Sequence, residues 1–239
     1  MNSSRKTAII VGVLFIIATL FLFIGGSFYN PILSSPDYLD NAYPNKMIVL
    51  TGILIEFICV IAMPLIAVFL FPILKKHNEA LALGYVGFRI IEAVLYIGME
   101  INKLSLINVS QDYLNRVGTD ASYFLNIGSS IQSVNDWAFS IYLIVFSLGA
   151  LMLYFVLYKS KLIPRFISVW GFIAAAVMLV GSVMIMVDMF TEISMGLELI
   201  LVLPIAVNEM VLAGWLIVKG FNPSAIASES AKTDINEIK

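Results

Sequence analysis

The chain has 239 residues, of which 60% are hydrophobic and only 13% are charged, and its mean hydropathy is +0.96. Soluble domains carry about a quarter charged residues, so this balance excludes an ordinary globular protein and indicates an integral membrane protein. The net charge of −2, with no basic stripe, gives no reason to expect nucleic-acid binding.

Six apolar stretches are long enough to cross about 30 Å of hydrocarbon as helices. We predict these helices at residues 7–28, 47–74, 81–107, 133–158, 166–188 and 195–218. The fold class is therefore all-α, a six-helix transmembrane bundle that forms one domain over residues 1–221. The polar residues 222–239 predict a disordered cytoplasmic tail. The first stretch could also be a cleaved signal peptide, but its length favours an uncleaved helix.

Basic residues predict the orientation of the bundle. They gather at the two termini and at every second connection, as Arg5, Lys6, Lys75, Lys76, Lys159, Lys161, Arg165 and Lys219. The positive-inside rule then places both termini in the cytoplasm. On the opposite side, residues 29–46 contain three prolines and predict a folded cap. Residues 108–132 predict the longest loop, with a short interfacial helix near residues 111–114.

Charged residues inside the apolar stretches are the main functional signal. Arg89 and Glu92 lie one turn apart in the third predicted helix, whereas Glu56 and Glu209 lie in the second and sixth. A rise of about 1.5 Å per residue places all four about 12–16 Å from the inner boundary, near the membrane midplane. One charge at that depth costs about 2.5–3.5 kcal/mol, so we expect the four side chains to converge inside the bundle.

Further polar residues extend this predicted site. Tyr85 and Tyr96 share a helical face with Arg89 and Glu92, and Asn208 precedes Glu209. The candidate ligand- or proton-binding residues are thus Arg89, Glu92, Glu56, Glu209, Asn208, Tyr85 and Tyr96. Three carboxyls beside one guanidinium predict a protonated glutamate or a bound cation. Glu100 and Lys103 continue the same face, and we expect them to be solvated charges at the outer membrane boundary.

The sequence offers little support for catalysis. His77 is the single histidine, which excludes a His-rich metal site or a His-based triad within one chain. Cys59 has apolar neighbours and predicts a buried, inert thiol. We find no nucleophile motif and no phosphate-binding glycine loop. We therefore predict no catalytic residue, no metal and no cofactor.

Two interpretations of the buried charges stay open. In the first, the chain is a small transporter, or a membrane protein that binds a small molecule or lipid, and its carboxylates exchange protons. In the second, it is a structural or interaction subunit whose ion pairs only hold the helices together. An intramembrane enzyme is a weaker third interpretation. The expected partner is the lipid bilayer, and a homo-oligomer is compatible with the sequence.

Three segments resemble an uncharacterised family of bacterial six-helix membrane proteins, which is defined only as a domain of unknown function. They are Gly87-Phe-Arg-Ile-Ile-Glu-Ala-Val-Leu95, Tyr158-Lys-Ser-Lys-Leu-Ile-Pro-Arg-Phe-Ile-Ser-Val-Trp-Gly171 and Leu203-Pro-Ile-Ala-Val-Asn-Glu-Met-Val-Leu-Ala-Gly-Trp-Leu-Ile-Val-Lys-Gly-Phe221. The resemblance implies a protein of the bacterial cytoplasmic membrane and implies no activity. It also suggests that Arg89, Glu92 and Glu209 belong to the family pattern.

Overall fold

A computed structural model describes residues 3–118, 120–187 and 195–226, and these are helical with short connections. The elements are α1 (Ser3–Leu33), α2 (Tyr38–Asn41), α3 (Lys46–Leu74), α4 (Glu79–Leu114), α5 (Ala121–Ser160), α6 (Arg165–Met186) and α7 (Met195–Val218). All but α2 contain a segment long and apolar enough to cross a membrane. The predicted all-α fold with six membrane-spanning helices is confirmed. The predicted tail lies outside the described residues from position 227 onward.

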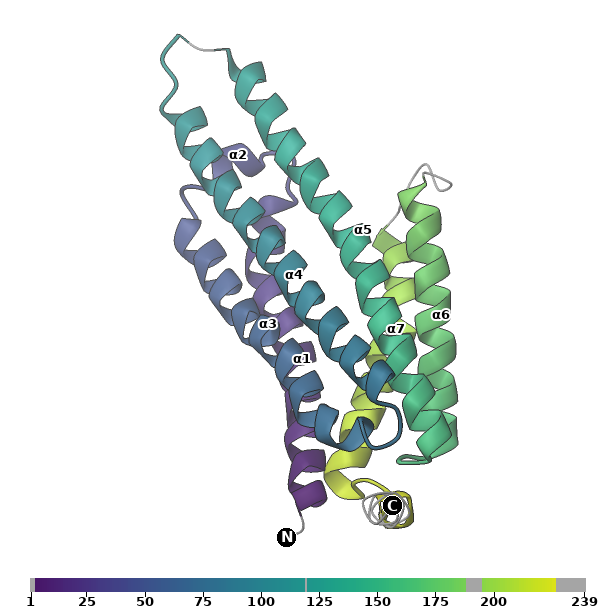
Figure 1. The fold of residues 1–239 in the computed structure, drawn as a ribbon. Coiled ribbons are helices and arrows are strands. Elements are labelled where there is room, and N and C mark those ends of the chain that lie inside the picture. The colour runs from purple at the N-terminus through teal and green to yellow at the C-terminus, as the bar shows by residue number, and fades with distance from the viewer. Residues whose placement is uncertain (1–2, 119, 188–194, 227–239) are drawn as a thin grey trace.

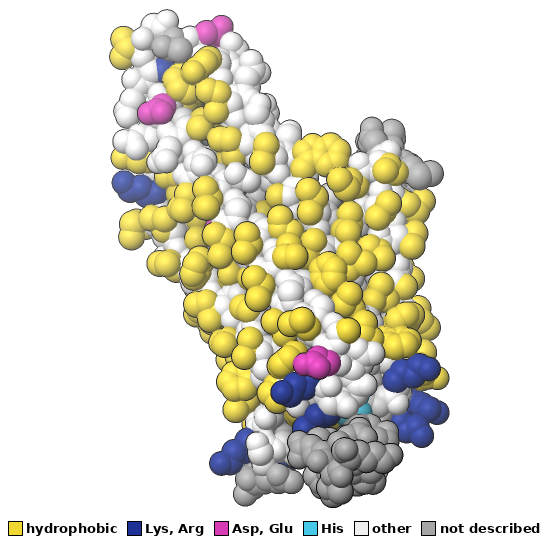
Figure 2. All heavy atoms as spheres, in the orientation of Figure 1, with side chains coloured by type: hydrophobic (Ala, Val, Ile, Leu, Met, Phe, Trp, Pro, Cys, Tyr) yellow, Lys and Arg dark blue, Asp and Glu magenta, His cyan; other side chains and the backbone are white. Residues whose placement is uncertain are grey.

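The six long helices form a closed ring. Each packs against the next in chain order, and α7 completes the ring against α1 (Figure 1). Both termini lie at one end, which we call the basal end; the opposite end, which holds the α4–α5 connection, is the apical end. A belt of apolar side chains covers the middle of the visible face, and Lys and Arg side chains gather at the basal end (Figure 2).

The helices α4 and α5 are longer than their apolar stretches predict. The prediction of a loop over residues 108–132 is wrong, because α4 continues to Leu114 and α5 begins at Ala121. The two helices project past the rest of the bundle at the apical end (Figure 1). Their polar extensions can stay helical because each has a long neighbouring helix to pack against.

Side chains fix the start of both of these helices. The Asn78 side chain accepts a hydrogen bond from the Leu81 amide at 3.0 Å, and Asp120 accepts one from the Ser122 amide at the same distance. Such caps satisfy amides that have no partner within the helix. The hydrogen bond from Ser122 also holds the pKa of the exposed Asp120 carboxyl below its usual range.

The connection between α1 and α3 folds over the apical part of α4, in agreement with the cap predicted there. It contains the short helix α2, whose Leu39 carbonyl accepts a hydrogen bond from the Ser110 hydroxyl. The same hydroxyl accepts one from the Tyr43 amide at 2.9 Å. Since Ser110 is fully buried, these bonds tie the cap to α4 at a dry contact.

The basal end is closed by a bond between the first and last helices. The Arg5 guanidinium donates to the carbonyls of Leu216 at 2.9 Å and Ile217 at 2.6 Å, at the end of α7. Gly220 follows with a φ of 75°, a left-handed conformation that glycine adopts without strain. A cation at a helix carboxyl end is favourable, so Arg5 stabilises α7 and holds it against α1.

Candidate functional site

One face of α4 supplies most of the buried polar side chains. Tyr85, Arg89, Glu92 and Tyr96 recur at spacings of three and four residues, as predicted, and all four are buried. Glu100 and Lys103 continue the same face and are buried as well. The prediction of solvated boundary charges at these two positions is therefore wrong, because the apical parts of neighbouring helices cover them.

The first group of charges, which we call the arginine cluster, consists of Tyr85, Arg89, Glu92 and Glu209. Arg89 donates from Nε to the Tyr85 hydroxyl at 3.1 Å and from Nη1 to Glu92 at 2.8 Å. Its Nη2 donates to Glu209 Oε1 of α7 at 3.2 Å. The structure thus brings Arg89, Glu92 and Glu209 together, three of the four charged residues that are expected from the sequence to converge.

The second group, which we call the lysine cluster, consists of Tyr29, Glu56, Glu100 and Lys103. The Lys103 ammonium donates to the Tyr29 hydroxyl at 2.7 Å and to Glu56 and Glu100 at 2.9 Å each. Tyr29 in turn donates to Glu56 at 2.7 Å. The three N–H bonds of the ammonium thus each have an acceptor.

Glu56 pairs with Lys103, so the prediction that it joins Arg89 is wrong. On α4, Lys103 and Arg89 are fourteen residues apart, which corresponds to about 21 Å of helix rise. A depth obtained from the number of residues along a helix holds only for a helix perpendicular to the membrane, and it leaves out the length of the lysine side chain. Tyr29, which completes this cluster, was not selected from the sequence because it lies outside the apolar stretch predicted for α1.

A close contact between α1 and α3 brings Tyr29 to Glu56. A Cβ atom on Gly52 would lie 2.7 Å from the Gly25 carbonyl oxygen, and one on Gly25 would lie 2.3 Å from Glu56 Cγ. The two glycines therefore allow the backbones to approach within a distance that any larger residue would prevent. The lysine cluster depends on this approach for two of its four side chains.

A single cavity reaches both clusters. It has a volume of about 650 Å³ and is lined by residues of all six long helices, among them Glu56, Arg89, Glu92, Lys103 and Glu209. Its rim includes side chains of the apical half that are exposed, such as Phe23 of α1 and Asp136 of α5, so the cavity opens to the outside of the bundle.

Glu209 is the member of the arginine cluster that is most accessible from this cavity. Its side chain is 13% exposed, against 2% for Glu92. Glu209 Oε1 binds Arg89, whereas no partner is found for Oε2 among the described residues. The second oxygen can therefore accept a proton or a ligand without breaking the bond to Arg89.

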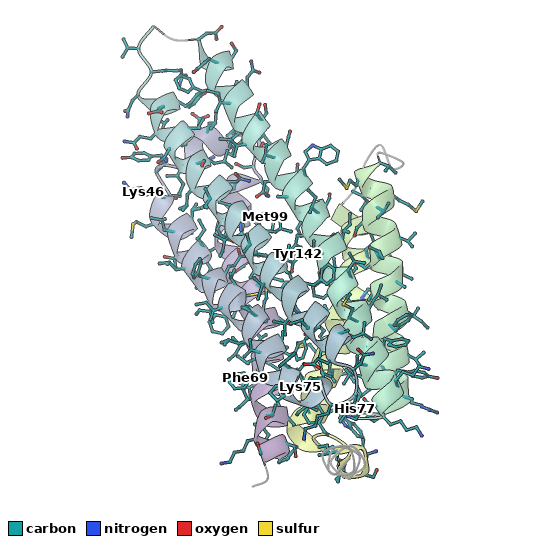
Figure 3. The ribbon with its side chains drawn as sticks, in the orientation of Figure 1. Lys46, Phe69, Lys75, His77, Met99 and Tyr142 are labelled. Carbon is teal, nitrogen blue, oxygen red and sulfur yellow. The ribbon has the colours of Figure 1, made fainter. Side chains whose placement is uncertain are left out.

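Tyr96 and Asn208, the other predicted site residues, have different positions. Tyr96 lines the cavity, and its ring meets the Tyr142 ring edge-on at a centroid distance of 5.6 Å. Tyr142 lies about halfway along the bundle (Figure 3). Asn208 is fully buried and donates to the Ile167 carbonyl of α6 at 3.0 Å, so it joins α7 to α6 and does not belong to either cluster.

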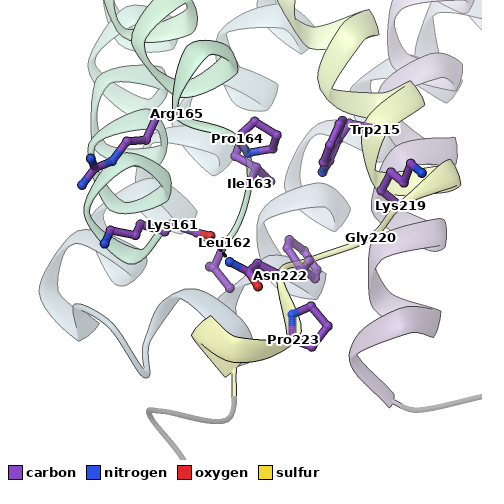
Figure 4. A pocket seen from close by; sticks show the side chains of 11 residues that line it. Lys161, Leu162, Ile163, Pro164, Arg165, Trp215, Lys219, Gly220, Asn222 and Pro223 are labelled. Atoms are coloured by element: carbon purple, nitrogen blue, oxygen red, sulfur yellow. Dashed lines mark hydrogen bonds between the residues drawn. The ribbon is translucent and has the colours of Figure 1, made fainter.

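A second pocket, of about 500 Å³, lies at the basal end between the α5–α6 connection and the segment after α7. Its lining includes Lys161, Arg165 and Lys219, yet Lys161 and Arg165 extend away from Trp215 (Figure 4). Arg165 instead lies over the Tyr158 ring, 5.2 Å from its centroid. Because these cations do not converge, the cavity within the bundle is the stronger candidate site.

The comparison with protein families agrees with this architecture. A model of the family described as "Domain of unknown function (DUF4386)" matches residues 10–220. The chain belongs to this family. The DUF4386 match covers α1 from residue 10, the other five membrane-spanning helices and both charge clusters, and it confirms the predicted membership of an uncharacterised membrane-protein family. No curated protein and no solved structure matches the chain.

Proposed function

We propose that this chain is a protein of the bacterial cytoplasmic membrane that binds a small molecule in its central cavity and acts as a transporter and not as an enzyme. The observation that carries the proposal is the cavity of about 650 Å³, whose lining includes six Asp, Glu, Lys or Arg side chains. Cavities of several hundred Å³ with a few placed polar groups are typical of small-molecule sites. Ionisable residues at membrane depth mark substrate or proton pathways.

The distribution of charge supports an orientation with both termini in the cytoplasm. Lys and Arg side chains gather at the basal end, beside the termini (Figure 2). Basic residues near the ends of spans favour the cytoplasmic side of the membrane. In this orientation the cavity opens toward the outer half of the membrane, since its exposed rim lies in the apical half of the bundle.

The bond between Arg89 and Glu209 gives the transporter a movable contact. It joins α4 to α7, two helices that are not neighbours in the ring. A proton or a ligand on Glu209 would reduce the attraction to Arg89 and let α7 move relative to α4. The binding energy of the ligand would then favour one arrangement of the bundle over another.

A structural role is the second candidate, and the lysine cluster favours it. Its two carboxylates are almost fully buried, Glu56 at 1% exposure and Glu100 at 3%, and both bind the same ammonium. These contacts tie α4 to α3, and Tyr29 adds α1. On this interpretation the charges specify which helices meet, and the protein would serve as a membrane subunit for a partner.

A screen for ligands with a pair of matched variants tests the proposal. Ala206 lines the cavity, whereas the adjacent Val207 is exposed on the outside of α7. We expect some compounds from a charge-balanced library to raise the melting temperature of the wild type and of Val207→Phe, but not of Ala206→Phe. The proposal is contradicted if no compound raises the melting temperature of the wild type, or if every such increase is also found with Ala206→Phe.

The effect of pH on Glu92→Gln separates the two candidate functions. The arginine cluster holds two carboxylates and one guanidinium. If Glu92 exchanges a proton as part of a binding site, the stability of the wild type depends on pH. In that case Glu92→Gln is at least as stable as the wild type, and its stability depends less on pH. A purely structural ion pair predicts that the variant is less stable at every pH. Thermal unfolding in detergent with native lipids retained measures both quantities.

A further inference from the structure

The charge of the cavity lining is unbalanced. Four of its ionisable residues are acidic and two are basic: Glu56, Glu92, Asp136 and Glu209 against Arg89 and Lys103. Among the described residues, Asp136 forms no ion pair and lies at the rim. A lining with this excess of carboxylates attracts positive charge into a space of low dielectric constant, where the attraction is strong.

Both cations are already paired with carboxylates. The ammonium of Lys103 donates to three acceptors, and three of the five N–H groups of the Arg89 guanidinium donate to Tyr85, Glu92 and Glu209. An anion would find at most the remaining two N–H groups of Arg89, and there it would lie beside the carboxylates of Glu92 and Glu209, which repel it. Acceptors without a donor also line the cavity. Among the described residues, no partner is found for Glu209 Oε2, and the buried side-chain oxygen Oδ1 of Asn135 accepts no hydrogen bond.

An aromatic wall stands along the α5 side of the cavity. The Phe139 and Tyr142 rings stack at a centroid distance of 5.9 Å, and Phe146 follows Tyr142 at 6.4 Å. All three residues line the cavity, and Tyr96 of α4 meets Tyr142 edge-on. Aromatic faces attract organic cations through their quadrupoles and also supply apolar contact.

We propose that the ligand of this cavity is an apolar organic cation, which enters past Asp136, lies against the Phe139 and Tyr142 rings, and pairs with Glu209. The inference rests on the proposed function, because it names the ligand class of that same cavity. The pairing is with Glu209 Oε2, so the bond from Arg89 to Oε1 persists and keeps the carboxylate in place.

Two probes of almost equal size and opposite charge test the inference directly. Tetraphenylphosphonium and tetraphenylborate differ in the sign of their charge and little in shape. Equilibrium binding to the purified full-length protein in lipid nanodiscs is expected for the phosphonium, and at least tenfold weaker binding for the borate, after subtraction of binding to empty nanodiscs. Equal binding of the two ions, or preference for the borate, overturns the inference.

Variants locate the bound cation. We expect Glu209→Gln to weaken phosphonium binding by about tenfold or more, because it removes the charge and keeps the shape. Asp136→Asn at the exposed rim and Tyr142→Leu in the wall are expected to weaken it as well. Glu79→Gln, at an exposed basal position, is the matched control and leaves binding unchanged. Should Glu209→Gln fail to fold, Asp136→Asn carries the test, since unchanged binding in that variant and in Tyr142→Leu overturns the inference.

The inference and the proposed function fail in different ways. If the borate or neutral compounds bind and Ala206→Phe abolishes their binding, the cavity is a ligand site and only the preference for cations is wrong. If neither ion binds and no compound in the charge-balanced library binds, both are wrong.

Discussion

The arginine and lysine clusters are built from the same parts but differ in access. Each contains one cation, two carboxylates and one tyrosine hydroxyl, and each begins with a pair three residues apart on α4. The lysine cluster ties α4 to α1 and α3, and its two carboxylates are almost fully buried, with Glu56 at 1% exposure and Glu100 at 3%. The arginine cluster ties α4 to α7, and its Glu209 reaches the cavity.

This difference assigns the two interpretations of the buried charges to different regions. A group whose carboxylates are almost fully buried can hold helices together but gives a ligand little access to them. A group with a more accessible carboxylate can do both. The lysine cluster therefore fits the structural interpretation, and the arginine cluster fits the functional one. Substitutions matched between the two clusters test this division.

Removal of each cation is expected to have the largest effect. Lys103→Ala leaves Glu56 and Glu100 almost fully buried without their cation, and we expect a loss of about 3–5 kcal/mol in the free energy of unfolding. Arg89→Ala is expected to cost less, because Glu209 can take up water or a proton from the cavity. Reversible unfolding in mixed micelles measures both, with the exposed Lys75→Ala as control. A larger loss in Arg89→Ala would contradict the division between the clusters.

The glycine contact beneath the lysine cluster offers the next test. Gly52→Ala places a Cβ atom 2.7 Å from the Gly25 carbonyl oxygen, which must separate α1 from α3. We expect a loss of about 1–3 kcal/mol, as for other overpacked contacts. On α4, Gly98→Ala is the matched control, because its added Cβ meets no atom within 4 Å. Equal stability of the two variants, compared by thermal unfolding, would show that the close approach is dispensable.

Removal of the tyrosine hydroxyl from each cluster should change the free energy of unfolding by a smaller amount. In the lysine cluster, Tyr29→Phe removes an acceptor for Lys103 and a donor to Glu56, and we expect a loss of about 1–3 kcal/mol. The loss in Tyr85→Phe should be nearer 1 kcal/mol, since that hydroxyl accepts a single bond from Arg89 Nε. Melting temperatures of the two variants, measured side by side, decide the order. A greater loss of stability in Tyr85→Phe would indicate that the hydrogen bonds of the arginine cluster contribute more to stability than those of the lysine cluster.

The smallest effect is expected outside both clusters, at the cap of α5. The pKa of Asp120 lies below its usual range, so its contribution to stability is present above the ordinary aspartate pKa and disappears as the pH falls through the lowered value. Asp120→Asn keeps a good capping residue and removes this titration. We expect stability near neutral pH to change little and the acid part of the pH profile to flatten slightly. A large change at neutral pH would mean that the charge has another role.

The sequence alone determined the class of the protein and the helix that carries its chemistry. Apolar stretches of more than twenty residues must be helical in a membrane, because no other single segment satisfies its own backbone there. The spacing of Tyr85, Arg89, Glu92 and Tyr96 also fixed one polar face on α4, since helical periodicity is a local property. Prediction of the apical extensions failed for the opposite reason, because polar helices depend on their neighbours.

Which charges pair is a property of the tertiary structure. The depth in the membrane expected from the sequence placed Glu56 with Arg89, yet in the structure Glu56 pairs with Lys103. Asn208 contacts the backbone of α6 and neither of the charge clusters. Pairing depends on helix tilt, on the close approach of Gly25 to Gly52 and on the reach of long side chains, none of which is encoded in the spacing along one helix. Access is also a tertiary property, because the cavity that exposes Glu209 exists only where six helices surround it.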